Sequence, residues 1–307
     1  MPQTPALALL APGQGSQTPG MLAPWLELPG AEERVAAWSE AIGLDLARLG
    51  TTATADEITD TAVTQPLVVA ATLLAHRELT GRGLLAGAQT IVAGHSVGEI
   101  AAYAIAGVLE ADDAVTLAAT RGSEMAKACA VEPTGMAAVL GGDETEVLGR
   151  LDALDLVPAN RNAAGQIVAA GAIAALEKLA EDPPAKARVR LLATAGAFHT
   201  HYMSSALDGY AAAAEHVTAA DPAATLLSNA DGQPVTSAAD AMTKLVAQLT
   251  RPVRWDLCTE TMRAREVRAI IEFPPAGTLV GIAKRELRGV PTYAVKTPAD
   301  LDGLAEL

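Results

Sequence analysis

Basic residues and cysteines are scarce in this chain of 307 residues. It contains 22 Lys and Arg against 36 Asp and Glu, which gives a formal net charge of −14. Nucleic-acid binding needs clustered positive charge to neutralise phosphates, so this composition argues against a nucleic-acid partner. Cys129 and Cys258 lie far apart with no CxxC pattern, which argues against a disulfide framework and a thiolate metal site. We interpret both as small buried residues and expect no metal.

Long apolar runs are also missing. Gly, Pro and charged residues interrupt every apolar stretch well short of the ~20 residues that a membrane span needs. The N-terminal apolar run 6–10 is too short for a signal peptide, and no basic residue precedes it. Because two unpaired cysteines fit a reducing compartment, these absences predict a cytoplasmic protein without a membrane partner.

Aromatic residues make up only 3% of the chain, whereas half of it is apolar. The core must therefore be built from Ala, Val, Leu and Ile. At roughly 150 residues per domain, the length suggests about two domains.

Apolar periodicity and turn residues predict an α/β protein. A buried strand over 6–11 ends in a Pro-Gly turn, and a short strand over 90–93 ends at a glycine. Helical spacing covers 67–79, 99–109 and 112–127. Strand, tight turn and helix therefore follow one another around residue 94.

The elements become shorter between about 129 and 193. Their order is strand, helix, strand, strand, helix, strand, which is that of the split ferredoxin-like unit βαββαβ. Clear members are the strands 135–140, 166–170 and 188–193 and the helices 144–154 and 173–180. Such a unit has neighbouring ends and can be inserted into a larger domain. We therefore expect a small domain at 129–193, inserted into a large domain formed by 1–128 and 194–307.

The segment Gly94-His95-Ser96-Val97-Gly98 matches the nucleophile elbow GxSxG. In this motif a strand-to-helix turn exposes a nucleophilic serine, and the expected strand and helix on each side supply that context. The backbone N–H of Val97 would lie at the helix N-terminus, where an oxyanion can be bound. The alternative interpretation is an ordinary turn in which the serine only caps the helix.

A glycine-rich segment, GQGSQ at 13–17, follows the first expected strand. Its glycines allow the backbone to approach another group closely, so this loop could supply a second N–H to the same oxyanion. A phosphate-binding loop is the alternative, but neither GxGxxG nor the GK[ST] ending of a P-loop is present.

Further segments join these two motifs. Together they are GQGSQ at 13–17, TQP at 64–66, GHSVGE at 94–99, Arg121, AFH at 197–199 and QLTRPVRW at 248–255. In this order and spacing the chain resembles, over essentially its whole length, the malonyl-CoA:acyl-carrier-protein transacylases of fatty acid and polyketide synthesis. The resemblance implies an α/β-hydrolase-like large domain with a mostly parallel sheet, a ferredoxin-like insertion and an active site between them.

The same resemblance implies the reaction and its residues. A malonyl group passes from malonyl-CoA to Ser96 and then to the phosphopantetheine thiol of acyl carrier protein, without a cofactor. His199 is the matching general base, favoured over His201 by the family's spacing of four residues to a methionine. The backbone N–H groups of Gln14 and Val97 match the oxyanion hole. No Asp or Glu between the serine and the histidine stands out as a third triad member, and the family instead orients its histidine through the backbone carbonyl matching Gln248.

Three residues are expected to bind the acyl group by the same resemblance: Gln65, Arg121 and Phe198. A guanidinium can bind the free malonyl carboxylate through two parallel hydrogen bonds, although an arbitrary helical Arg is more often a solvated surface charge. Phe198 and Val97 resemble malonyl-selective rather than methylmalonyl-selective enzymes. A bulky residue there can exclude a methyl branch, which usually discriminates by only ~1–3 kcal/mol.

Two other functions remain as alternatives. An acyl-thioester hydrolase of the proofreading type would share the nucleophile, base and oxyanion hole and would differ only in admitting water. A non-catalytic carrier-protein docking subunit would not need Ser96, His199 and Arg121. The motifs leave the oligomeric state open, and the resemblance implies a monomer. The motifs fit a carrier from either fatty acid or polyketide synthesis.

The negative charge of the chain should repel CoA and carrier proteins, which are themselves anionic. Docking therefore requires local basic patches. We expect them at Lys186, Arg188 and Arg190 of the small domain and at Lys284, Arg285 and Arg288 of the large one.

Overall fold

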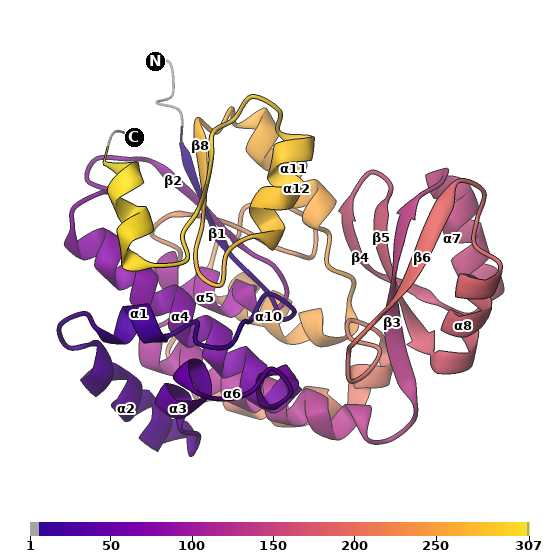
Figure 1. Cartoon of the computed structure of the whole chain (residues 1–307), viewed down its shortest axis with the longest axis horizontal. Coiled ribbons are helices and arrows are strands. Elements are labelled where there is room, and N and C mark those ends of the chain that lie inside the picture. Colours follow the sequence, from indigo (N-terminus) through magenta and orange to yellow (C-terminus); the bar gives the residue numbers. More distant parts are fainter. Residues whose placement is uncertain (1–5, 306) are drawn as a thin grey trace.

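Two β-sheets of different character organise the chain in the computed structural model, which describes residues 6–305 and 307 (Figure 1). The larger sheet has the strand order β7-β2-β1-β8-β9, and every neighbouring pair is parallel. Its strands are β1 (Leu7–Ala11), β2 (Thr90–Gly94), β7 (Thr225–Leu227), β8 (Ala269–Glu272) and β9 (Thr292–Ala294). The fold class is therefore α/β with a mostly parallel sheet, as the sequence predicts.

The strands of this sheet are apolar at almost every position, so both of its faces must be covered. Along β1, Leu9 and Ala11 belong to one apolar cluster, whereas Ala8 and Leu10 belong to a second. Alternation of side chains along the strand places these clusters on opposite faces. The covering helices are α1 (Ala23–Leu26), α2 (Ala31–Ile42), α3 (Leu46–Thr51), α4 (Thr61–Gly81), α5 (Gly98–Ile105), α6 (Ala111–Cys129), α9 (Leu207–Glu215), α10 (Ala238–Ala247), α11 (Trp255–Ala264) and α12 (Thr278–Glu286). Short 3-10 turns are η1 (Glu57–Thr59), η2 (His201–Ala206), η3 (Gln248–Thr250) and η4 (Pro298–Leu304).

The smaller sheet is antiparallel and has the order β4-β5-β3-β6 (Figure 1). It is formed by β3 (Thr134–Gly141), β4 (Val157–Ala163), β5 (Gln166–Ala172) and β6 (Ala187–Leu192), with helices α7 (Glu144–Ala153) and α8 (Ile173–Glu181) between strands. This is the strand order of the βαββαβ unit that the sequence predicts. Val253 joins the two parts, because its N–H donates to Ala159 and its carbonyl accepts from Arg161, each over 2.9 Å.

Helices α4 and α6 pack closely because Gly122 has no side chain. A Cβ atom at this position would lie 2.6 Å from the carbonyl oxygen of Thr61, much nearer than non-bonded contact allows. The close approach brings Gln65 of α4 and Arg121 of α6 within hydrogen-bond distance. Two residues from distant parts of the sequence thus reach one site.

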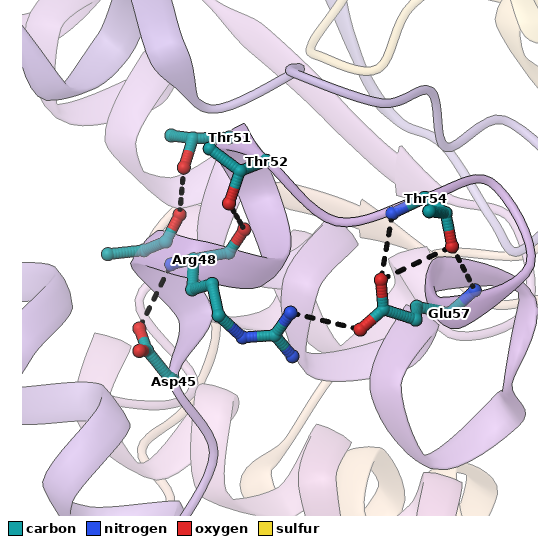
Figure 2. A network of polar contacts seen from close by, with 7 residues as sticks. Asp45, Arg48, Thr51, Thr52, Thr54 and Glu57 are labelled. Carbon is teal, nitrogen blue, oxygen red and sulfur yellow. Dashed lines mark hydrogen bonds and ion pairs between the residues drawn. The ribbon is translucent and has the colours of Figure 1, made fainter.

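A surface network holds the segment that leads into α4 (Figure 2). Asp45 caps α3 by accepting from the backbone N–H of Arg48 over 2.9 Å, and the guanidinium of Arg48 pairs with Glu57 over 2.9 Å. Glu57 also accepts from the N–H and hydroxyl of Thr54. These bonds fix η1, which directly precedes the first turn of α4.

Two helix boundaries differ from the sequence predictions. The helix expected at 99–109 already ends at Ile105, because Gly107 adopts a left-handed conformation with φ 80°. The helix expected at 67–79 begins earlier, at Thr61, where Asp60 accepts from the N–H of Ala62. The cysteine prediction holds for buried Cys258, whereas Cys129 is only half-buried.

Within the described part of the chain, no helix has the length and apolar character required to cross a membrane.

Candidate active site

Ser96 lies in a sharp turn between β2 and α5, and its φ of 54° falls in the left-handed region. The glycines on both sides are needed for this turn. A Cβ atom at Gly94 would lie 2.0 Å from the carbonyl oxygen of Gly98, and one at Gly98 would lie 2.3 Å from that of Ala11. The local sequence therefore forms the strained elbow that GxSxG predicts.

Asn229 braces this elbow from the loop after β7. Its Oδ1 accepts from the backbone N–H of Ser96 over 2.8 Å, and its Nδ2 donates to the carbonyl of Gly94 over 2.7 Å. One side chain thus bonds to both sides of the turn, and the backbone polar groups of Ser96 and Gly94 are satisfied.

His199 contacts Ser96 directly. Its Nε2 lies 2.7 Å from the Ser96 hydroxyl, and its Nδ1 lies 2.9 Å from the backbone carbonyl of Gln248. A carbonyl oxygen only accepts hydrogen bonds, so Nδ1 carries the proton and Nε2 is free to accept one from the serine. His201 is exposed and packs against Tyr202, with ring centroids 4.2 Å apart.

Burial and the nearby positive charge of Arg121 lower the pKa of His199 to about 3. Both causes act against the charged imidazolium. The imidazole is therefore neutral at neutral pH and is in the form that can act as a base.

Arg121 is buried beside the serine, with 1% of its surface exposed. It donates to the side-chain oxygens of Gln65 and Gln248, each over 2.8 Å, and to the Ser96 hydroxyl over 3.3 Å. Its Nε is buried and has no acceptor among the described residues. Burial lowers the pKa of Arg121 to about 10, so it remains charged. A buried guanidinium held by neutral groups is suited to binding a carboxylate.

The backbone N–H groups of Gln14 and Val97 donate to no other group among residues 6–305. Val97 precedes the first residue of α5, and Gln14 follows Gly13, whose missing side chain permits close packing on the elbow. A Cβ atom at Gly13 would lie 2.6 Å from the carbonyl oxygen of His95. The Gln14 side chain donates to Thr61 over 3.2 Å, which fixes the loop on α4.

These groups face a cavity of about 330 Å³ between the two sheets. Of the sequence-predicted site residues, Gln14, Gln65, Ser96, Arg121, Phe198 and His199 line it. Val97 and Gln248 are not among the lining residues, although the backbone carbonyl of Gln248 contacts His199. The small sheet contributes Met136, Ala138, Val168 and Leu192. Phe198, which is 7% exposed, lies beside the base.

Sequence reasoning did not identify four polar residues of the site. Asn160 and Asn162 of β4 line the cavity, and the side chain of Asn162 contacts His95 over 2.9 Å. Asn229 and Glu99 form the buried layer behind the serine. The only sequence signal was that Glu99 ends the segment GHSVGE; the three asparagines stand in no motif.

This arrangement of elbow serine, histidine and buried arginine defines an acyl-transfer site, and the comparisons agree. The family model described as "Acyl transferase domain" matches residues 9–299, and the chain belongs to this family.

The names of individual relatives specify the acyl group and its acceptor, which the family description does not. The chain is 81% identical over 291 residues to "Malonyl CoA-acyl carrier protein transacylase" of Mycolicibacterium smegmatis, which covers 94% of this chain and 100% of the relative. The solved structure "MCAT from Mycobacterium tuberculosis" is 77% identical, with a TM-score of 0.96 and coverage of 98% and 99%. A malonyl-transacylase solved in complex with a type II PKS acyl-carrier protein has 30% identity, a TM-score of 0.91 and coverage of 98% and 99%. The family resemblance of the sequence motifs is thereby confirmed.

Proposed function

We propose that the protein transfers malonyl groups from malonyl-CoA to the phosphopantetheine thiol of acyl carrier protein. The observation that carries this proposal is the Ser96–His199 pair beside the buried guanidinium of Arg121. The pair supplies a nucleophile and base, and the guanidinium supplies a partner for the free carboxylate of malonate. The names of the relatives point to the same reaction.

In the first half-reaction His199 Nε2 takes the proton of Ser96 Oγ as that oxygen attacks the thioester carbonyl. The C–O bond forms, and the negative oxygen is held by the N–H groups of Gln14 and Val97. Collapse then breaks the C–S bond. The leaving CoA thiolate takes the proton from the imidazolium, and malonyl-Ser96 remains.

The second half-reaction runs in the reverse sense. His199 takes the proton of the phosphopantetheine thiol, and the thiolate attacks the ester carbonyl of malonyl-Ser96. The C–S bond forms, the C–O bond breaks, and the proton returns to Ser96 Oγ. The backbone carbonyl of Gln248 keeps the imidazole in the required tautomer throughout.

Arg121 and Gln65 would hold the malonyl carboxylate, and Phe198 would restrict the space at its α-carbon. This assignment is supported by the position of all three in the cavity lining. An α-methyl group would meet the Phe198 ring, so we propose that the enzyme prefers malonyl over methylmalonyl donors. Equal rates of Ser96 acylation from both donors would contradict this preference.

We also propose that residues 129–193 form an inserted small domain and that 1–128 with 194–307 form the large one. The smaller sheet uses strands within 134–192 only, and β7, β8 and β9 complete the larger sheet. The cavity between the sheets would then lie at the domain boundary. We expect a monomeric, cytoplasmic enzyme that needs no cofactor.

Docking of the carrier protein is proposed at the mouth of this cavity. Along β6, Ala187 and Val189 pack toward α7 and α8, so Arg188, Arg190 and Leu192 point to the opposite face. Leu192 lines the cavity, and the two exposed arginines continue from it to the surface.

From the large domain, Arg285 of α12 reaches Gln166 of the small sheet over 2.5 Å. Its positive charge thus lies beside the same mouth. An anionic carrier would find local positive charge there despite the negative charge of the whole molecule.

Intact-mass measurement tests the function. The protein is mixed with malonyl-CoA, and phosphopantetheinylated carrier protein is then added. We expect a malonyl adduct that the variant Ser96→Ala cannot form and that only the carrier thiol discharges. Release of malonate without a thiol would instead identify a hydrolase, and absence of any adduct would identify a docking subunit.

A further inference from the structure

A buried carboxylate lies behind the site and takes no part in the steps above. Glu99, in the first turn of α5, is 1% exposed. One oxygen accepts from the backbone N–H of Asn229 over 2.6 Å, and the other accepts from the side-chain Nε2 of Gln248 in a short contact. Neither oxygen touches a Lys or Arg side chain among the described residues.

Gln248 links this carboxylate to Arg121. Its Nε2 donates to Glu99 and also, over 3.1 Å, to the backbone carbonyl of Ser96, while its Oε1 accepts from Arg121 over 2.8 Å. The amide has two orientations of nearly equal shape but opposite polarity. Burial raises the pKa of Glu99 to about 7, so the ionised form dominates only above that pH. When Glu99 is ionised it accepts at one end of the amide, so Nε2 faces Glu99 and Oε1 faces the guanidinium. The reverse orientation would place two donors against each other.

We propose that Glu99 is a positioning residue that acts as an indirect counter-charge for Arg121 through the side chain of Gln248. A direct Glu–Arg ion pair would occupy the guanidinium and compete with the substrate. The intervening amide instead gives Arg121 an oriented acceptor and leaves its remaining donors for an acyl carboxylate. Glu99 would thereby contribute to the choice of carboxylated acyl groups, an inference that rests on the proposed function.

Glu99→Gln tests this inference with almost no change of shape. Both oxygens of Glu99 accept hydrogen bonds, and a glutamine can offer an acceptor to Asn229 or to Gln248 but not to both. Whichever way it turns, one donor is left opposed, and an NH₂ group facing Gln248 removes the acceptor that holds the Gln248 amide in its orientation toward Arg121. We expect the ratio of kcat/KM for malonyl-CoA to that for acetyl-CoA in Ser96 acylation to fall by at least about tenfold.

A matched control is Glu272→Gln. Glu272 is also fully buried, and among the described residues its side chain accepts only from the backbone N–H groups of Gly277, Leu279 and Val280. This variant should lose stability but keep the malonyl-to-acetyl ratio. Any loss of activity in Glu272→Gln should be equal for malonyl-CoA and acetyl-CoA. If Glu99→Gln also lowers the two rates equally, Glu99 is only a structural residue and the inference is wrong.

Gln248→Met provides a second test if Glu99→Gln does not fold. Methionine has a similar length, and the backbone carbonyl that orients His199 is kept, whereas both polar side-chain atoms are lost. We expect the same loss of malonyl preference, and an unchanged ratio would overturn the inference. The proposed function is tested separately by the wild-type protein: failure to form malonyl-Ser96 would refute the function itself, before any variant is compared.

Discussion

At the level of single residues, the charge of Arg121 acts on His199. Both are almost completely buried, and both line the same cavity. Burial disfavours a charged imidazole and the nearby cation disfavours it further, so His199 stays neutral without a carboxylate partner. The backbone carbonyl of Gln248 is then sufficient to orient the ring.

The pKa of His199, lowered to about 3, predicts that its imidazole remains neutral at pH 5. NMR of ¹⁵N-labelled histidine in the Ser96→Ala variant measures this directly, with the urea-unfolded protein as control, whose histidines titrate near 6.5. Because the native state binds the proton more weakly, the contribution of His199 to the free energy of unfolding is full above pH 6.5. It is lost as the pH falls from 6.5 toward 3. A native midpoint near 6.5 would contradict this prediction.

Removal of the guanidinium in Arg121→Ala should lower kcat/KM for malonyl-CoA by at least about 30-fold and affect acetyl-CoA much less. Truncating a buried charged partner costs roughly 2 kcal/mol or more of binding free energy. The acetyl group has no carboxylate, so it has no such interaction with Arg121 to lose. Arg121→Lys keeps the charge without the planar fork and should recover only part of the malonyl rate. Equal losses with both donors would show that Arg121 does not bind the carboxylate.

At the level of elements, the turn between β2 and α5 depends on glycine more than on any hydrogen bond. Ala8 to Ala11 and Ile91 to Ala93 are buried strand residues that bring the elbow to the carboxyl edge of the sheet. There the backbone of α5 begins directly against the end of β1, at Gly98. Ligand sites of parallel sheets commonly lie at this edge.

Gly98→Ala should therefore destabilise the protein by roughly 1–3 kcal/mol and abolish Ser96 acylation, because its Cβ would lie 2.3 Å from the carbonyl oxygen of Ala11. Gly281→Ala, in helix α12, is the matched control. Apart from its chain neighbours and the backbone of its own helix, no atom of the described residues lies within 4 Å of the Cβ that it adds, and Ala is the better helix former. We expect Gly281→Ala to stabilise the protein by about 0.4–1 kcal/mol in urea unfolding. Comparable losses in both variants would contradict the steric argument.

Local patterns predict the elements of this fold well, because strands such as 6–11 are continuous apolar runs ending in Pro or Gly. They predict boundaries less well, since Gly107 ends α5 before its apolar pattern stops. The nucleophile elbow is predictable from five consecutive residues. The layer behind it is not, because Glu99 meets Asn229 and Gln248 at sequence separations of 130 and 149 residues. Only the folded chain brings them together.

At the level of the whole molecule, the net charge of −14 should repel the two proposed substrates, CoA thioesters and carrier protein, which are also anionic. The small sheet offers a local solution, because one face packs on α7 and α8 while the other carries Arg188 and Arg190 outward from the cavity. The approach of a carrier protein would then depend on a few charges near one opening.

Arg190→Glu should lower kcat/KM for the carrier protein by about tenfold at low salt, with the difference shrinking as ionic strength rises. Lys178→Glu is the matched control, because it changes the charge equally but lies on α8, on the opposite face of the sheet. Transfer rates to the carrier measure the effect. Identical rates for the two variants would place docking elsewhere on the surface.

The contact between Arg121 and the Ser96–His199 pair has a further consequence for the order of events. In the free enzyme burial and, after it, the charge of Arg121 lower the pKa of His199. A carboxylate bound to the guanidinium would offset the second of these causes, and we expect it to raise that pKa. The acyl group that is to be transferred would thus activate the imidazole that transfers it. Acyl groups without a carboxylate leave the base weak, so an acetylated Ser96 should discharge slowly even when a carrier thiol is in place.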